Sequence, residues 1–201
     1  MSLMSFLTWM DNLPSSIALR ESTWTYPIVE SVHSVGICLF VGLTLLWDLR
    51  LLGIGLRRIP VSEVWTKLIP WMTLGALIMM STGVALFFSK PLFFWSNIFF
   101  RLKLVALVVA LLNAMAFHFG IEKKLVDWDT SPHTPTAAKL AGFSSMAMWA
   151  IVIVFGRFIA YNWFECGNEQ PGWVNTAQDC AHSTKGAKLL GAEAAHGGEG
   201  H

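Results

Sequence analysis

The sequence predicts an all-α integral membrane protein, a four-helix bundle with both chain ends on the outer side of the membrane. Its composition points to lipid as the solvent, because 54% of the 201 residues are hydrophobic and only 13% are charged, against about a quarter charged in soluble domains. The chain also holds four long charge-free stretches, each near the ~20 residues that a helix needs to cross ~30 Å of hydrocarbon. These features exclude a cytosolic enzyme, and a net charge of +1 offers no attraction to nucleic acid.

Four membrane spans follow from these stretches, and each is predicted as a helix because a helix satisfies its own backbone hydrogen bonds in lipid. The first span begins at Pro27, a residue that suits a first helical turn, and reaches Leu52 if Glu30 and Asp48 are tolerated. The predicted spans are about 27–52, 68–89, 101–121 and 140–163. They make up a membrane domain of residues 27–163.

Lys and Arg near the span ends predict the orientation, because basic connections stay in the cytoplasm. The first and third connections carry basic residues at Arg50, Arg57, Arg58, Lys67, Lys123, Lys124 and Lys139. In the second connection, Arg101 and Lys103 already stand at the mouth of the third span. We therefore expect a multi-pass protein of the bacterial inner (cytoplasmic) membrane with its N- and C-termini outside.

The N-terminal segment, residues 1–26, lacks the basic start of a signal peptide. Phe6, Leu7, Met10 and Leu13 fall at helical spacing, which predicts a short helix lying on the outer membrane surface. A plain entry segment without such a helix is the alternative.

The C-terminal tail, residues 164–201, ends in Ala, Gly, Glu and His, a composition that predicts a flexible periplasmic segment. Cys166 and Cys180 lie in this tail. In an oxidising compartment they could form a disulfide, and two free surface thiols are the alternative.

Ionisable residues inside membrane spans are functional hypotheses, because each costs ~2.5–3.5 kcal/mol or more at the bilayer centre. Glu30 and His33 stand one helical turn apart near the outer end of the first span. Arg157 lies near the outer end of the last span, and Met79 and Met80 reach a compatible depth in the second. We expect these side chains to converge in one outer pocket.

Such a pocket suits a b-type haem. His33 would be an axial ligand, Met79 or Met80 the opposite ligand, and Arg157 the partner of a propionate. Glu30 could orient the imidazole or relay a proton. A structural ion pair between Glu30 and Arg157, with His33 hydrogen-bonded beside it, is the alternative.

Two further candidates lie deeper or at the other membrane face. Trp149 belongs to a stripe of the last span that has glycine at two positions, where small residues let a helix or a flat cofactor approach. His118 ends a small-residue seam on the third span and could ligate a second haem, face a quinone headgroup, or contact lipid phosphates. His33 and His118 are roughly 20 Å apart at ~1.5 Å per residue, so any haem is single-His, His/Met, or completed by another subunit.

Three runs of residues carry a resemblance to a known family: Glu30–Gly36, Asp48–Gly53 and Gly156–Tyr161. They are similar to an uncharacterised family of small bacterial four-span membrane proteins, and the resemblance covers about residues 22–163. That family looks distantly like the membrane domain of copper-resistance D-type proteins and cytochrome b-like four-helix bundles. The resemblance implies this architecture and the importance of Glu30, His33 and Arg157, and it implies no settled activity.

Three functions are compatible with these features. The first is a b-type haem protein that passes electrons between membrane quinone and a partner at the outer face. The second is an accessory or anchoring subunit of a larger membrane complex, or a homo-oligomer. The third is transport of copper or another metal ion, although the sequence shows no clear ladder of Met or Cys ligands. No motif for hydrolysis is present.

Overall fold

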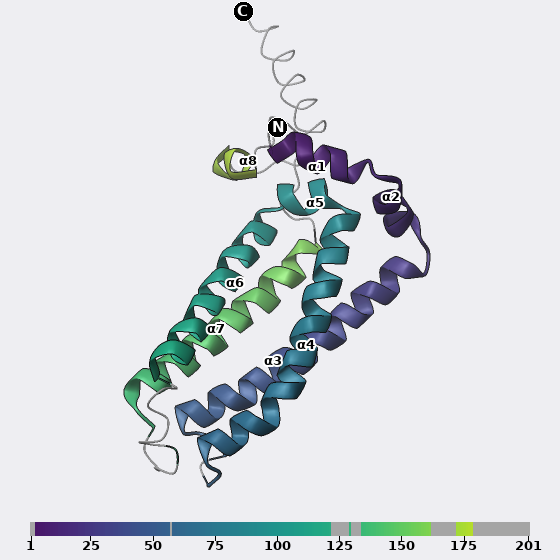
Figure 1. Ribbon diagram of the computed structural model, residues 1–201. Helices are drawn as coiled ribbons and strands as arrows, with labels where there is room; N and C mark the ends of the chain where they lie inside the picture. Colours follow the sequence, from purple (N-terminus) through teal and green to yellow (C-terminus); the bar gives the residue numbers. More distant parts are fainter. Residues whose placement is uncertain (1–2, 57, 122–128, 130–133, 162–171, 179–201) are drawn as a thin grey trace, which may run out of the picture.

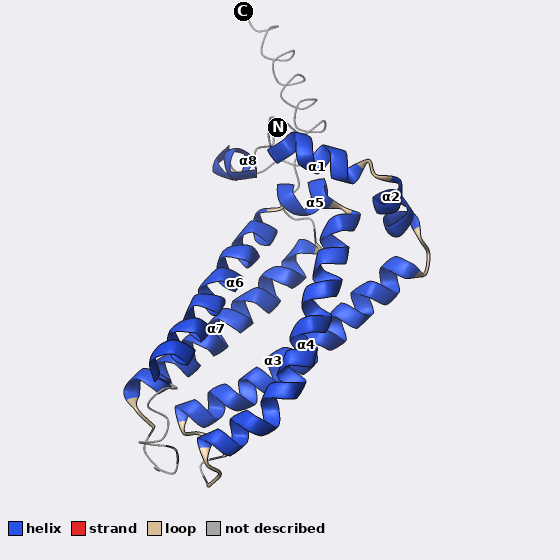
Figure 2. Ribbon diagram, viewed as in Figure 1, coloured by secondary structure: helices blue, strands red, loops and turns tan. Residues whose placement is uncertain are grey.

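The computed structural model describes residues 3–56, 58–121, 129, 134–161 and 172–178, and within these ranges it is helical with no strand (Figures 1 and 2). Four helices are long and apolar enough to cross a membrane: α3 (Thr25–Leu52), α4 (Val61–Ser89), α6 (Ile98–Ala116, extended by the π-helical turn η1, Phe117–Ile121) and α7 (Thr136–Ile159). The prediction of an all-helical, multi-pass membrane protein is confirmed. Its orientation in the membrane stays a prediction.

The four long helices form two antiparallel pairs, α3 with α4 and α6 with α7, and the pairs meet along α3 and α7 (Figure 1). Three short helices, α1 (Leu3–Asp11), α2 (Pro14–Glu21) and α5 (Pro91–Ser96), lie at one end of this bundle. We call it the α5 end, and the opposite end, where α3 turns into α4, the Gly53 end. A further helix, α8 (Gly172–Gln178), lies outside the bundle.

The helices start earlier than the apolar runs that predict them. α4 begins at Val61 rather than near residue 68, and its first turns carry Glu63 and Lys67, which form an exposed ion pair of 2.6 Å between carboxylate and ammonium. Such charged turns stand outside hydrocarbon, so an apolar run locates the membrane crossing and not the helix start. The end of α3 at Leu52 agrees with the prediction, because Gly53 takes a left-handed conformation (φ 71°) that stops the helix.

Glycines set the close approach of α3 and α4. A Cβ at Gly36 would stand 2.9 Å from Ile78 Cγ2, and a Cβ at Gly75 would stand 2.8 Å from the Phe40 backbone nitrogen. These two contacts lie on opposite helices, so each backbone fits against the other. Small residues have this role in membrane bundles, where lipid provides no hydrophobic drive for helices to associate.

The two helix pairs contact each other along α3 and α7. At the α3–α7 contact, a Cβ at Gly142 would stand 3.1 Å from the Asp48 carbonyl oxygen and 3.1 Å from Leu51 Cβ. Within the second pair, the Asn113 amide donates to the Ala141 carbonyl at 3.0 Å. The Gly53 end also holds a cluster of buried apolar side chains: Trp47, Leu51, Val61, Val64, Phe117 and Ala138.

The N-terminal segment folds as two helices where the sequence predicts one. Leu7 of α1 is buried, and the buried Ser16 hydroxyl of α2 donates to the Phe88 carbonyl at the end of α4 (2.8 Å). Arg20 pairs with Asp11 at 3.1 Å and so ties α2 to α1. Whether these helices lie on the membrane surface stays a prediction.

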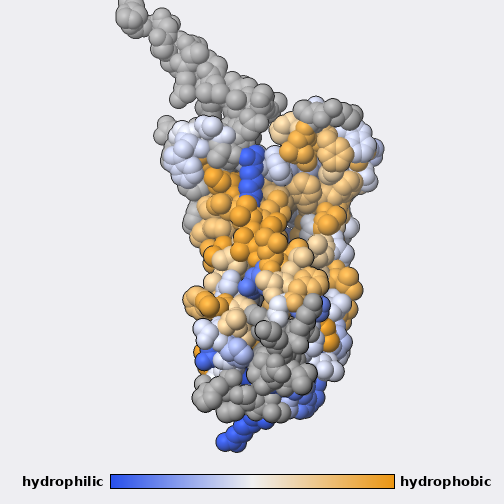
Figure 3. Space-filling view, turned by 60° about the vertical axis from the view of Figure 1, so that its left-hand side comes forward, coloured by the Kyte–Doolittle hydropathy of each residue, from blue (hydrophilic) through white to orange (hydrophobic). Residues whose placement is uncertain are grey.

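Apolar side chains gather over the middle of the molecule and hydrophilic ones toward its ends (Figure 3). Helix α4 alone exposes Trp71, Leu74, Leu77, Met80 and Val84. A soluble protein rarely exposes so large an apolar surface. Lipid is the solvent that suits it.

The start of α4 is capped by a residue far along the chain. The Asp129 carboxylate accepts hydrogen bonds from the Ser62 backbone N–H and the Ser62 hydroxyl, both at 2.7 Å, and the Asp129 carbonyl accepts from the Val61 N–H at 3.3 Å. These bonds hold the pKa of Asp129 below its ordinary value of 3.8. The ionised form is therefore the one that stabilises the fold.

We expect the Asp129→Asn variant to unfold more easily at neutral pH, by about 1 kcal/mol, the usual loss for a helix cap. A carboxyl whose pKa is lowered by folding contributes stability above its unfolded pKa, and that contribution disappears as pH falls through the lower folded pKa. The difference in melting temperature between wild type and variant should therefore shrink as the pH is lowered below about 4. A difference that grows on acidification would contradict this role.

Candidate functional site

His33 is the predicted site residue that the structure places inside the bundle. It is half-buried on α3 near the α5 end, and its Nδ1 lies 2.9 Å from the Thr82 hydroxyl oxygen of α4. The Met79 backbone also lies close enough to act electrostatically on the ring. His33 is therefore fixed by α4 rather than by the last span.

The partners of Thr82 decide which nitrogen of His33 carries the proton. The Thr82 hydroxyl donates its own hydrogen to the Ile78 carbonyl, so toward His33 it can act only as an acceptor. Nδ1 must then be the protonated nitrogen. In the neutral ring this leaves the lone pair on Nε2, the atom with which a histidine held in this way ligates a metal or accepts a proton.

Gly83 leaves room for the His33 ring. A Cβ at this position would stand 3.2 Å from His33 Cε1. That spacing is tighter than an ordinary van der Waals contact, so a larger residue would have to displace the imidazole. The small residue beside Thr82 is thus part of the site.

Lys103 is the cation of this site. It lies on α6, half-buried, with its Nζ 3.5 Å from the position of a Cβ at Gly156 on α7. It is close enough for its charge to act on the His33 ring. His33, Thr82 and Lys103 thus bring an imidazole, a hydroxyl and an ammonium from three helices into one region of the bundle.

The sequence does not single out Lys103, because Lys103 and Arg101 both stand where the third predicted span begins. The two residues are two positions apart, about 200° around a helix, so they face opposite sides. Arg101 turns to the Trp95 carbonyl, which accepts from its Nε at 2.8 Å, while Lys103 faces α7. Helical spacing was the signal that could have separated them.

The other residues of the predicted outer pocket do not gather around His33. Glu30 and Arg157 are both exposed, and within the described residues no ion pair joins them. The Arg157 guanidinium lies over the Tyr161 ring, 5.1 Å from its centre. Met80 is 61% exposed, and Met79 acts on the His33 ring through its backbone.

The remaining candidates lie elsewhere. Trp149 packs edge-on against Phe40, with ring centres 4.9 Å apart, and lines a cavity between α3 and α7. His118 is exposed in η1, at the Gly53 end, with its ring centre 5.2 Å from that of Phe119. Cys166 and Cys180, together with their predicted disulfide, lie outside the described residues.

Two charged residues near the end of α3 are buried, although the sequence assigns one of them, Arg50, to a basic connection outside the membrane. Asp48 and Arg50 are each 2% exposed. Arg50 Nε donates to the Ile59 carbonyl at 3.0 Å, across the turn that joins α3 to α4. Asp48 faces Gly142 and Ser145 of α7.

Metal-ligand side chains do not cluster in the part of the chain that the structure describes: it contains no group of three or more His, Cys, Asp and Glu residues able to hold a metal ion.

A family model described as a family of unknown function, DUF6644, matches residues 21–162. The chain belongs to this family. The match covers α3 to α7, so the His33 region lies within the matched residues. Comparison with curated proteins and with solved structures gives no match, so the more distant resemblance to copper-resistance D-type proteins and cytochrome b-like bundles has no support from them.

Proposed function

We propose that this protein binds one b-type haem near the α5 end and passes electrons between membrane quinone and a partner, in a bacterial inner membrane. The observation that carries the proposal is the 2.9 Å hydrogen bond between His33 Nδ1 and the Thr82 hydroxyl, in which Nδ1 is the donor when Thr82 donates to the Ile78 carbonyl. It leaves the Nε2 lone pair for iron and fixes the ring, as the second partner of a metal-ligating histidine usually does.

The donor set suits haem in part. His33 supplies a neutral imidazole, and Lys103 supplies a cation for a propionate, a role that the sequence suggests for Arg157. Glu30 is exposed and joins neither contact. When bound, the haem would supply a one-electron couple, and the protein's own residues would hold it and limit its contact with water.

A second axial ligand from Met79 or Met80 does not fit this arrangement. Met79 acts on the His33 ring through its backbone, on the same helix as Thr82. Met80 is largely exposed on α4. We therefore propose a single-His haem within one protomer, which leaves the sixth position to a second subunit or to an exogenous ligand.

The expected result is a Soret band in protein purified from a haem-replete host, and its loss in the His33→Ala variant. His118→Ala is the matched control and should keep the band, because His118 stands at the Gly53 end. Thr82→Val should keep the fold and lower haem occupancy, because Nδ1 then loses its acceptor. Colourless wild-type protein, or a band that survives in His33→Ala, would contradict the proposal.

A further inference from the structure

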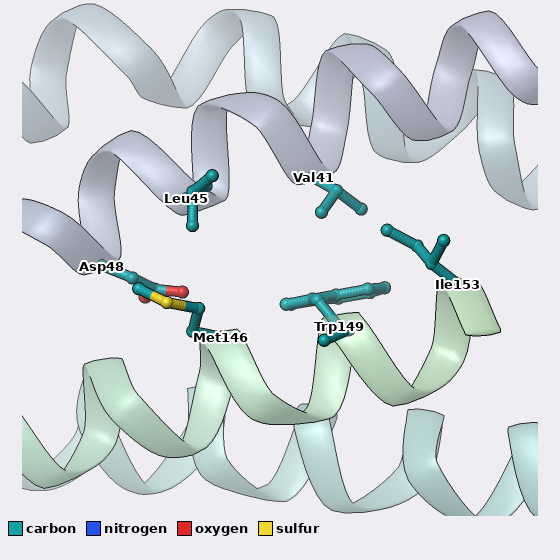
Figure 4. Close-up of a pocket in the computed structure, with 7 residues that line it drawn as sticks. Val41, Leu45, Asp48, Met146, Trp149 and Ile153 are labelled. Atoms are coloured by element: carbon teal, nitrogen blue, oxygen red, sulfur yellow. The ribbon is translucent and has the colours of Figure 1, made fainter.

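A cavity of about 160 Å³ lies between α3 and α7, away from the His33 region. Figure 4 shows its lining residues: Val41, Leu45 and Asp48 from α3, and Met146, Trp149 and Ile153 from α7. All of these except Asp48 are apolar. The cavity therefore offers an apolar space with a single acidic group.

Only part of the hydrogen-bonding capacity of the Asp48 carboxyl is satisfied. The residue is 2% exposed, and Ser145 of α7 hydrogen-bonds its side chain. Oδ2 has no hydrogen-bond partner among the described residues. Figure 4 shows the carboxyl directed into the space between the two helices, beside Met146. A buried carboxyl oxygen without a donor is rare in folded proteins, and it indicates a missing partner.

The described residues around Asp48 do not supply a positive charge. On its own helix, Arg50 donates to the Ile59 carbonyl and interacts with Asp129. On α4, Lys67 is exposed and paired with Glu63. Lys139 of α7 and His118 of η1 are also exposed. A carboxylate at Asp48 would therefore have to find its counter-ion in a ligand.

We propose that this cavity binds a lipophilic organic ammonium ion, whose ammonium group pairs with Asp48 Oδ2 and whose apolar body lies between Met146 and Trp149. The size fits one aromatic ring, since an apolar cavity of ~150 Å³ holds benzene. The Trp149 ring adds a surface that attracts cations.

The depth of the cavity suits an amphiphile. Asp48 lies four residues before the end of α3, and Val41 lies about two helical turns farther into the span. A ligand with its charge on Asp48 would keep that charge near the Gly53 end and direct its apolar body toward the middle of the bundle. Amphiphilic molecules adopt this arrangement in a bilayer.

The test is binding of benzylammonium to the full-length protein in detergent, measured by equilibrium dialysis, with benzyl alcohol as a neutral probe of similar size. We expect benzylammonium to bind more tightly than benzyl alcohol, and Asp48→Asn to weaken only the ammonium, by roughly 30-fold or more. Lowering the pH should weaken binding in the wild type, because a protonated carboxyl cannot pair with a cation. Glu30→Gln removes a carboxylate of the same helix and should leave binding unchanged.

Equal affinity for the two probes would overturn the proposal, and so would ammonium binding that persists in Asp48→Asn. Failure of wild-type protein to bind benzylammonium at millimolar concentration would also overturn it. The comparison of the two probes on wild-type protein needs no variant, so it stands even if Asp48→Asn does not fold. Because the cavity is separate from the His33 region, the result does not depend on haem.

Discussion

Replacing Gly75 with alanine is expected to destabilise the protein by about 1–3 kcal/mol, the usual cost of overpacking a closely packed contact. The added methyl group would stand 2.8 Å from the Phe40 backbone nitrogen and 3.1 Å from its Cα. Both atoms belong to the backbone of α3, so no side-chain rotation can relieve the contact. The two helices must separate along their length.

Gly42→Ala is the matched control. It lies on α3, and a Cβ at this position meets nothing within 4 Å, so alanine should be neutral or raise stability slightly through its better helix propensity. Thermal unfolding in one detergent, followed by circular dichroism, compares the two variants. A Gly75→Ala protein as stable as Gly42→Ala would show that α3 and α4 are not packed as described.

Replacing Asp48 with leucine is expected to stabilise the protein by about 1–3 kcal/mol, the usual cost of a buried polar group left without a hydrogen bond. Leucine would fill part of the cavity and remove the unpartnered oxygen. The same change should abolish benzylammonium binding. The Asp48→Leu change would then raise the stability of the protein and remove its ligand binding.

The control for this prediction is Asp129→Leu, in which a carboxylate with several hydrogen-bond donors is removed. It should lose stability where Asp48→Leu gains it. Melting temperatures in a ligand-free detergent test both variants together. A destabilised Asp48→Leu protein would mean that the Asp48 carboxyl has compensation in the fold.

The four membrane helices could be predicted from the sequence, because a long run without charged residues indicates a segment that lies in the hydrocarbon of the bilayer. Their starts could not, since α4 continues through Glu63 and Lys67 in a region where lipid no longer selects the residue type. Gly53 follows the end of α3 both in the sequence prediction and in the structure, because a left-handed residue after a helix is a local property of the chain.

The candidate site could be predicted only in part, for a physical reason. His33 is recognisable as an ionisable group in an apolar run, but its partners depend on how each helix is rotated about its axis. That rotation is set by contacts such as Gly36 and Gly75, which bring Thr82 of α4 beside His33. The rotation of α6 and α7 likewise turns Lys103 inward and leaves Arg157 exposed.

Asp48 shows the same limit. The sequence leaves open whether Asp48 pairs with Arg50, pairs with a neighbouring helix or reaches lipid headgroups. The structure buries it where Gly142 lets the α7 backbone approach its carbonyl. Burial here is decided by a glycine almost a hundred residues away in the chain.

Three short helices cover one end of the bundle. α1, α2 and α5 lie across that end (Figure 1), and Ser16 fastens α2 to the last turn of α4. The direct path from water along the bundle axis is therefore covered on this side. A ligand of the cavity between α3 and α7 would therefore not enter along the bundle axis from the α5 end.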